Sequence, residues 1–173
     1  SQTDLELRPE LLDRYATLVV VGHDEYWTAS MRDTVDAFLD NGGNFARFGA
    51  NFIWQIRLED DGNTQVCYKY RARAEDPVAE TVHRHLLTSA WEDVIVDRPG
   101  ASTVGVNGFR GVYAGWGGFA PNGARGFTVY RPDHWCLRGT NLGYGDLLGE
   151  DGRAFGYEVD GLEYTIINGV PVP

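Results

Sequence analysis

One short segment carries a dense group of side chains that could do chemistry, His23-Asp24-Glu25-Tyr26-Trp27. A carboxylate such as Glu25 is a hard metal ligand, and an imidazole two residues away, His23, is a general base. Two such groups do not make a metal site by themselves. The structural alternative is that a carboxylate favours a helix N-terminus, Trp27 packs in the core and His23 makes an ordinary hydrogen bond. The residues alone leave both interpretations open.

Three later residues are candidates for substrate binding at the same site. Asn51 follows the next expected strand, and Lys69, near the end of a further one, could bind an anionic or carbonyl group. His134 also follows an expected strand, so it could face the same cleft as His23. The structural alternatives are an exposed edge-strand charge for Lys69 and plain packing against Trp135 for His134.

Covalent catalysis by cysteine or serine has no good candidate in this chain. Asn51 stands where a nucleophile elbow of an amidotransferase-like protein needs a cysteine, and no Gly-x-Ser-x-Gly motif occurs. Cys67 and Cys136 lie outside any such turn, and two distant cysteines favour reduced thiols over a disulfide framework. An enzyme built on this chain would therefore use a metal or a carboxylate.

The elements that must position these residues follow from the apolar pattern. Residues 18–21 form an apolar run without alternation, which predicts a strand buried on both faces of a parallel sheet. A helix is expected over residues 28–41, with a capping box from Ser30 to Asp33 and an end at Gly42-Gly43. A second strand at 44–48 would lie beside the first by a right-handed crossover. The predicted core of this unit is Val19, Val21, Val35, Phe38 and Leu39.

The remaining chain predicts shorter elements. A strand is expected at 64–70, and Asp76-Pro77 would open a helix that runs to about Trp91. His83 and His85 would then point to different sides of that helix, so they would not chelate one ion. Glycines recur through 100–126, and strands are expected at 127–131, 155–159 and 162–167. With no evident linker, the chain is expected to be one α/β domain, 1–173, whose second half is rich in strands and loops.

Whole-chain properties exclude two classes of partner. The net charge of −10 would repel a phosphate backbone, so no nucleic acid is expected as a partner. The longest apolar run is far shorter than the ~20 residues that cross a bilayer, so no membrane segment is expected. No signal peptide is visible either, which favours a cytoplasmic location. Whether the chain forms a homo-oligomer stays open.

In combination, several motifs resemble the C-terminal region of the large (beta) subunit of N,N-dimethylformamidase. They are Gly22-His23-Asp24-Glu25-Tyr26-Trp27, Met31-Arg32, Gly42-Gly43, Gly49-Ala50-Asn51, Pro132-Asp133-His134-Trp135, Gly139-Thr140 and Gly156-Tyr157-Glu158-Val159-Asp160. The resemblance implies a class I glutamine-amidotransferase-like fold, a parallel flavodoxin-like sheet flanked by helices. It also implies cleavage of an amide C–N bond with a mononuclear iron held by two tyrosines and one glutamate. Glu25 matches that glutamate, and His23 matches the neighbouring histidine.

The resemblance places the two tyrosine ligands upstream of Ser1. The chain would then be part of a larger domain, with the upstream part of its own polypeptide as a partner. Iron would bind in the complete protein and not to this chain alone, unless Tyr15 or Tyr26 substitutes.

Three functions follow from these observations. The first is an iron-dependent amide hydrolase acting on a small amide. The second is a non-catalytic module that binds a sugar-like ligand or a partner domain through exposed aromatic residues, Trp54, Trp116 and Trp135. The third is a purely structural scaffold in a larger polypeptide.

Overall fold

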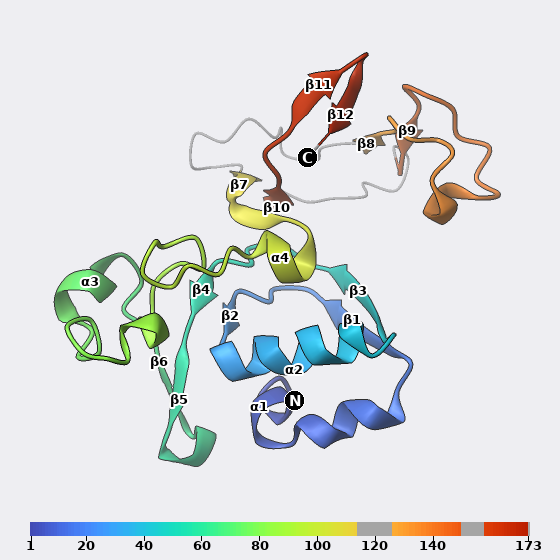
Figure 1. Ribbon diagram of the computed structural model, residues 1–173. Helices are drawn as coiled ribbons and strands as arrows, with labels where there is room; N and C mark the ends of the chain where they lie inside the picture. The colour runs from blue at the N-terminus through green and yellow to red at the C-terminus, as the bar shows by residue number, and fades with distance from the viewer. Residues whose placement is uncertain (114–125, 150–157, 173) are drawn as a thin grey trace. The chain divides into compact units, whose positions relative to one another are not determined.

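The computed structural model describes residues 1–113, 126–149 and 158–172, which form mixed helix and strand structure with small sheets. The chain divides into two compact units, Ser1–Phe109 and Arg110–Pro173. Figure 1 shows the elements of each unit along the chain. No helix in the described part of the chain has the length and apolar character needed to cross a membrane.

The first unit contains the predicted strand, helix and strand. It begins with α1 (Asp4–Leu7) and a 3-10 helix, η1 (Pro9–Arg14), which Pro9 opens at its first position. Strand β1 (Thr17–Val21) then pairs in parallel with β3 (Asn44–Phe48), from Thr17 opposite Asn44 to Val21 opposite Phe48. Helix α2 (Ala29–Asp40) connects the two strands. The predicted parallel pair and its connecting helix are confirmed.

The cap of α2 lies two residues before the expected one. Thr28 is the N-cap, and its hydroxyl accepts a hydrogen bond from the Met31 backbone N–H at 3.1 Å. The Met31 sulfur in turn accepts from the Thr28 backbone N–H at 3.5 Å, so the box closes through a thioether instead of a carboxylate. The predicted Ser30 to Asp33 box is therefore wrong.

The expected burial of β1 on both faces is also wrong. Val19 and Val21 are 54% and 76% exposed, and Phe48 on β3 is 68% exposed. Leu18 and Phe45, on the other face, pack against the core. Among the described residues every sheet has two strands, so the expected larger parallel sheet is not evident and nothing described covers the outer face.

The core of the first unit lies on the inner side of this strand pair. Of the predicted members, Val35 is fully buried, Leu39 is partly buried against the core and Phe38 is half-buried. The buried cluster consists of Trp27, Met31, Val35, Phe52, Ala72, Leu87, Trp91 and Val96.

Arg32 is buried in the same region and joins α2 to residues 98–103. It donates to the carbonyls of Arg98 and Pro99, and its guanidinium carbon lies 4.3 Å from the centre of the Trp91 ring. Burial lowers the pKa of Arg32 to about 10, so the side chain still carries its charge at neutral pH.

The first unit also contains two further pairs of short strands. Strand β2 (Tyr26–Trp27) pairs in parallel with β4 (Trp54–Gln55). Strand β5 (Arg57–Glu59) pairs in antiparallel fashion with β6 (Thr64–Val66) across η2 (Asp60–Gly62). The expected strand at 64–70 ends early, because the chain turns into η3 (Lys69–Arg71) and α3 (Ala72–Glu75).

The helix expected from Asp76 is wrong. Residues 76–99 form turns with one 3-10 segment, η4 (Arg84–Leu86), before α4 (Ala101–Val104). Side chains of β4 and β5 take the carbonyls that helical N–H groups would need: Gln55 donates to His85 and Leu87, and Arg57 donates to Leu86. Tertiary hydrogen bonds therefore replace the helical ones here.

The second unit consists of short strand pairs and loops. Strand β7 (Asn107–Tyr113), which begins in the last residues of the first unit, pairs with β10 (Glu158–Gly161). Strand β8 (Phe127–Thr128) pairs with β9 (Leu147–Leu148). A 3-10 segment, η5 (Trp135–Leu137), lies between β8 and β9. Strands β11 (Thr165–Ile167) and β12 (Val170–Val172) form a hairpin. The strands expected at 127–131 and 162–167 are thus present in shorter form, and most of 155–159 lies outside the described residues.

Candidate functional site

Two loops meet at the carboxyl ends of β1 and β3: the first loop, residues 22–25, follows β1, and the second loop, residues 49–53, follows β3. The Gly22 N–H donates to the Phe48 carbonyl at 3.0 Å, and Gly22 has a φ of +89°. A Cβ atom on Gly49 would lie only 2.2 Å from the Gly22 carbonyl oxygen. Glycine is therefore required at position 49, because the two backbones touch there. This edge of a parallel sheet is where ligands commonly collect.

Arg47 connects the two loops through hydrogen bonds to both. Its guanidinium donates to the carbonyls of Gly49 and Ala50 at 3.0 and 2.9 Å and to the Asp24 carbonyl at 3.3 Å. It also forms an ion pair with the Asp24 carboxylate at 3.4 Å, and both side chains are only 7% exposed. The Trp27 indole N–H donates to the same carboxylate at 2.8 Å. Asp24 therefore has a structural role in the turn.

Glu25, the next residue, points its carboxylate to a different set of partners. The Trp54 indole N–H donates to Glu25 Oε1 at 2.8 Å, and Lys69 Nζ lies 3.9 Å from the same oxygen. The Glu25 side chain is 18% exposed. The parallel pairing of β2 with β4 produces this contact, because it sets Trp54 beside the Glu25 backbone, where the Trp54 N–H donates to the Glu25 carbonyl.

Lys69 connects Glu25 with the phenol of Tyr26. Its ammonium donates to the Tyr26 hydroxyl at 2.5 Å and lies 4.8 Å from the centre of the Tyr26 ring. Burial lowers the pKa of Lys69, but the hydrogen bond to Tyr26 and the charge of Glu25 outweigh burial and raise it above its ordinary value. Lys69 is therefore charged at neutral pH. We call Glu25, Tyr26, Trp54 and Lys69 the Glu25–Lys69 cluster.

The backbone of Lys69 is held in an uncommon conformation. Its φ of +53° is in the left-handed region, which residues other than glycine, asparagine and aspartate seldom adopt. The Lys69 N–H donates to the Thr88 carbonyl at 3.0 Å, and the Tyr68 N–H donates to the Thr88 hydroxyl at 3.0 Å. Thr88 therefore fixes the segment that carries the ammonium group.

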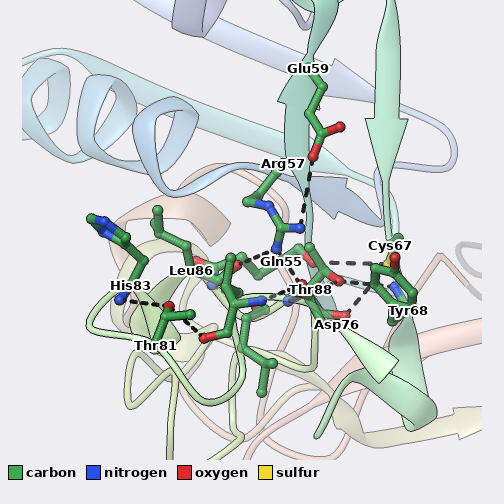
Figure 2. Close-up of polar contacts among 12 residues, drawn as sticks. Gln55, Arg57, Glu59, Cys67, Tyr68, Asp76, Thr81, His83, Leu86 and Thr88 are labelled. Atoms are coloured by element: carbon green, nitrogen blue, oxygen red, sulfur yellow. Dashed lines mark hydrogen bonds and ion pairs between the residues drawn. The ribbon is translucent and has the colours of Figure 1, made fainter. Parts of the chain in front are cut away.

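Asp76 fixes Thr88 in turn, as Figure 2 shows. The fully buried Asp76 carboxylate accepts from the Thr88 hydroxyl at 2.7 Å, the Thr88 N–H at 2.9 Å and Arg57 at 2.8 Å. Burial would raise the pKa of Asp76, but these hydrogen bonds lower it to about 2. The carboxylate is thus ionised in the folded protein, and it supports the site from behind.

Cys67 lies beside this network, and its thiol is not ionised. Its sulfur is 3.9 Å from the Gln55 carbonyl and 4.0 Å from the Thr88 carbonyl. Burial raises the pKa of the Cys67 thiol. Cys67 therefore stays protonated at neutral pH and behaves as a packing residue.

The other candidate residues lie at different places. His23 is exposed in the turn that carries Glu25. Asn51 is buried on the second loop, with a φ of +66°. His134 belongs to the second unit, where its ring contacts Cys136. The structure thus brings Glu25 and Lys69 together and places His23 and Asn51 on the two adjoining loops.

Sequence reasoning missed Tyr26 and Trp54 as members of the cluster. Trp54 was expected to be exposed for sugar binding, but it is 2% exposed, so that expectation is wrong. Trp135 is 75% exposed in the second unit, and Trp116 lies outside the described residues. A sequence signal was available: Tyr26-Trp27 and Trp54-Gln55 follow the two parallel strands after loops of similar length, which favours a second parallel contact.

The described residues do not form a complete iron site. Among them, no three His, Cys, Asp or Glu side chains gather to hold a metal ion. Tyr15 lies before β1 and Glu25 after it, so these side chains lie at opposite ends of the strand. The Tyr26 oxygen accepts from the Lys69 ammonium, and this positive group disfavours a cation at the same oxygen.

Comparison with known proteins identifies the family. No curated protein and no solved structure matches the chain. The model of one family, described as N,N-dimethylformamidase beta subunit-like, C-terminal, matches residues 1–173. Because this match covers every residue, the chain belongs to the N,N-dimethylformamidase beta subunit-like, C-terminal family.

Proposed function

We propose that this domain supplies the carboxylate side of the active site in a metal-dependent amide C–N hydrolase of the formamidase type. The observation that carries the proposal is the Glu25 carboxylate, which is mostly buried and held by the Trp54 indole N–H at the carboxyl ends of β1 and β3. The family match supports the same assignment. In the proposal Glu25 is a metal ligand in the complete protein.

The neighbouring side chains have separate roles in this proposal. Trp54 orients the carboxylate, because its N–H occupies one lone pair of Oε1. Lys69 supplies a fixed positive charge that would bind the carbonyl oxygen of an amide substrate and stabilise negative charge on it. His23, exposed in the same turn, would move protons, and Asn51 would bind the substrate from the second loop.

We also propose that an upstream part of the same polypeptide supplies the two tyrosine ligands. The β1–β3 pair supports this, because parallel sheets are almost always covered on both faces. Here Val21 and Phe48 are 76% and 68% exposed on one face. Further strands and a covering helix from the same polypeptide would bury that face and bring their own strand ends to the Glu25 edge.

The complete polypeptide with Glu25→Gln tests the role of Glu25. The amide keeps the shape of the side chain and loses its charge, so we expect bound metal and turnover of a small formamide to be lost while the melting temperature changes little. Glu80→Gln, at an exposed position, is the matched control and should keep both. Retention of metal and turnover in Glu25→Gln would overturn the proposal.

Two further measurements complete the test. His23→Ala should reduce turnover by roughly 10²–10⁴-fold if the imidazole moves protons, with little effect on bound metal. The isolated chain should bind no stoichiometric iron. Near-equimolar iron with a tyrosinate-to-iron absorption band would contradict this and point to Tyr15 or Tyr26 as a replacement ligand.

A second candidate function rests on Trp135, whose side chain is 75% exposed and lies beside the His134 ring, with ring centres 5.5 Å apart. An exposed indole is a suitable surface for stacking a sugar ring. In that case Trp135→Ala should abolish binding to a glycan array, and Glu25→Gln should leave it unchanged.

A further inference from the structure

We propose that His134 and Cys136 form a reactive thiol site at which low-molecular-weight disulfides modify Cys136. This site lies within the second unit and is independent of the Glu25–Lys69 cluster.

The geometry pairs the thiol with an imidazole nitrogen. His134 Nδ1 and Cys136 Sγ are 2.9 Å apart at the start of η5. The Cys136 backbone N–H also donates to the same Nδ1, at 3.4 Å. A nitrogen that accepts from a backbone N–H carries its lone pair, so in the neutral ring the proton is on Nε2. The Cys136 S–H is then placed to donate to Nδ1, which can take its proton.

The surroundings admit a second molecule. Cys136 is exposed, and together with His134 it lines a shallow pocket of about 340 Å³ that is open to solvent. The pocket is otherwise lined mainly by apolar side chains, among them Phe127, Tyr130, Leu137 and Leu148. The organic part of a disulfide can lie against this apolar surface while its sulfur approaches Cys136.

Cys67 provides an internal comparison. Burial raises the pKa of its thiol, whose sulfur lies near the carbonyls of Gln55 and Thr88. The nucleophile in thiol–disulfide exchange is the thiolate. The two cysteines of this chain should therefore react at very different rates.

The reaction balances without another reactant. The Cys136 thiol transfers its proton to His134 Nδ1, and the thiolate attacks one sulfur of a disulfide R–S–S–R. A new bond forms between Cys136 Sγ and that sulfur, the R–S–S–R bond breaks, and R–S⁻ leaves with the electron pair. The leaving thiolate takes the proton from the imidazolium or from water, so the small disulfide is the oxidant and one R–SH is the product.

The test uses the full chain with Cys67→Ser, so that one thiol reports, and 4,4′-dithiodipyridine, a neutral aromatic disulfide. We expect one thiopyridone released per chain, at a rate at least roughly tenfold above that of the Cys136→Ser variant, in which Cys67 reports. Glutathione disulfide should then add one glutathionyl mass to Cys136. Equal rates for the two cysteines would overturn the proposal.

The role of His134 has its own test. His134→Ala and His134→Gln should each slow the reaction roughly tenfold at pH 7, because the thiol then has no neighbouring base to take its proton. His85→Ala, an exposed histidine in the first unit, is the matched control and should change nothing. Unchanged rates in both His134 variants would refute activation by the imidazole.

Discussion

Replacing Asp76 by asparagine should destabilise the first unit strongly. The change keeps the size of the side chain but removes the charge that Arg57 faces at 2.8 Å, and the Arg57 side chain is only 16% exposed. An asparagine NH₂ group would also face donors from Arg57 and Thr88 that now share one carboxylate oxygen. Removing one partner of a buried pair costs about 3 kcal/mol.

The cost should depend on pH with a definite sign. The pKa of Asp76 is about 2 in the folded protein and 3.8 in its reference state. Because the folded value is the lower one, its contribution to stability is fully present above about pH 4 and is lost as pH falls toward 2. The pKa shift corresponds to about 2 kcal/mol. The difference in the free energy of unfolding between wild type and Asp76→Asn should therefore narrow from about 3 kcal/mol to about 1 kcal/mol near pH 2.

Urea unfolding at several pH values, followed by far-UV circular dichroism and tryptophan fluorescence, measures this gap. Glu75→Gln is the matched control, because Glu75 is the preceding residue and its ion pair with Arg71 is exposed. It should cost less than about 0.5 kcal/mol at any pH. A gap for Asp76→Asn that is equally small, or one that does not narrow on acidification, would refute the network as described.

Three other changes test separate features. Gly49→Ala should cost about 2 kcal/mol or more in urea unfolding, because its Cβ would lie 2.2 Å from the Gly22 carbonyl oxygen; an effect below 0.5 kcal/mol would show that the loops can separate. Thr28→Ala should cost about 1 kcal/mol by loss of the cap to the Met31 N–H, whereas Thr28→Ser should cost little. Val21→Asp should change the stability of this chain by less than about 0.5 kcal/mol, since Val21 is 76% exposed, but should lower the melting temperature of the complete polypeptide if another segment covers it.

The strand, helix and strand of residues 17–48 could be predicted because their signals are local. The apolar run of β1, the amphipathic pattern of α2 and the glycines at 42 and 43 act over a few residues each, and the crossover rule then sets the parallel pairing. The burial of β1 could not be predicted in the same way. Alternation is missing when both faces of a strand are apolar, but whether anything covers the second face depends on residues elsewhere.

The expected helix after Asp76 failed because distant side chains compete for its backbone. Its apolar spacing was suitable, but Gln55 and Arg57 bind the carbonyls of residues 85–87. The Asp76 carboxylate also accepts from the N–H groups of Val78 and Thr88, which closes the segment into a loop. Apart from the contact between Asp76 and Val78, each of these pairs is separated by 12 or more residues, so a local window of the sequence does not contain the information.

Within the candidate site, the sequence left the structural and functional interpretations of the turn equally open, and the structure supports a division between its two carboxylates. Asp24 is buried and occupied by Arg47 and Trp27, as the structural interpretation requires. Glu25 instead faces a charged lysine whose backbone is in the left-handed region, and such a conformation costs about 1 kcal/mol or more. Packing alone does not need a lysine in that conformation, because a glycine or asparagine would adopt it at lower cost. A lysine in this position is best explained by the ammonium group it brings to Glu25 and Tyr26, which is why the proposed chemistry centres on this pair.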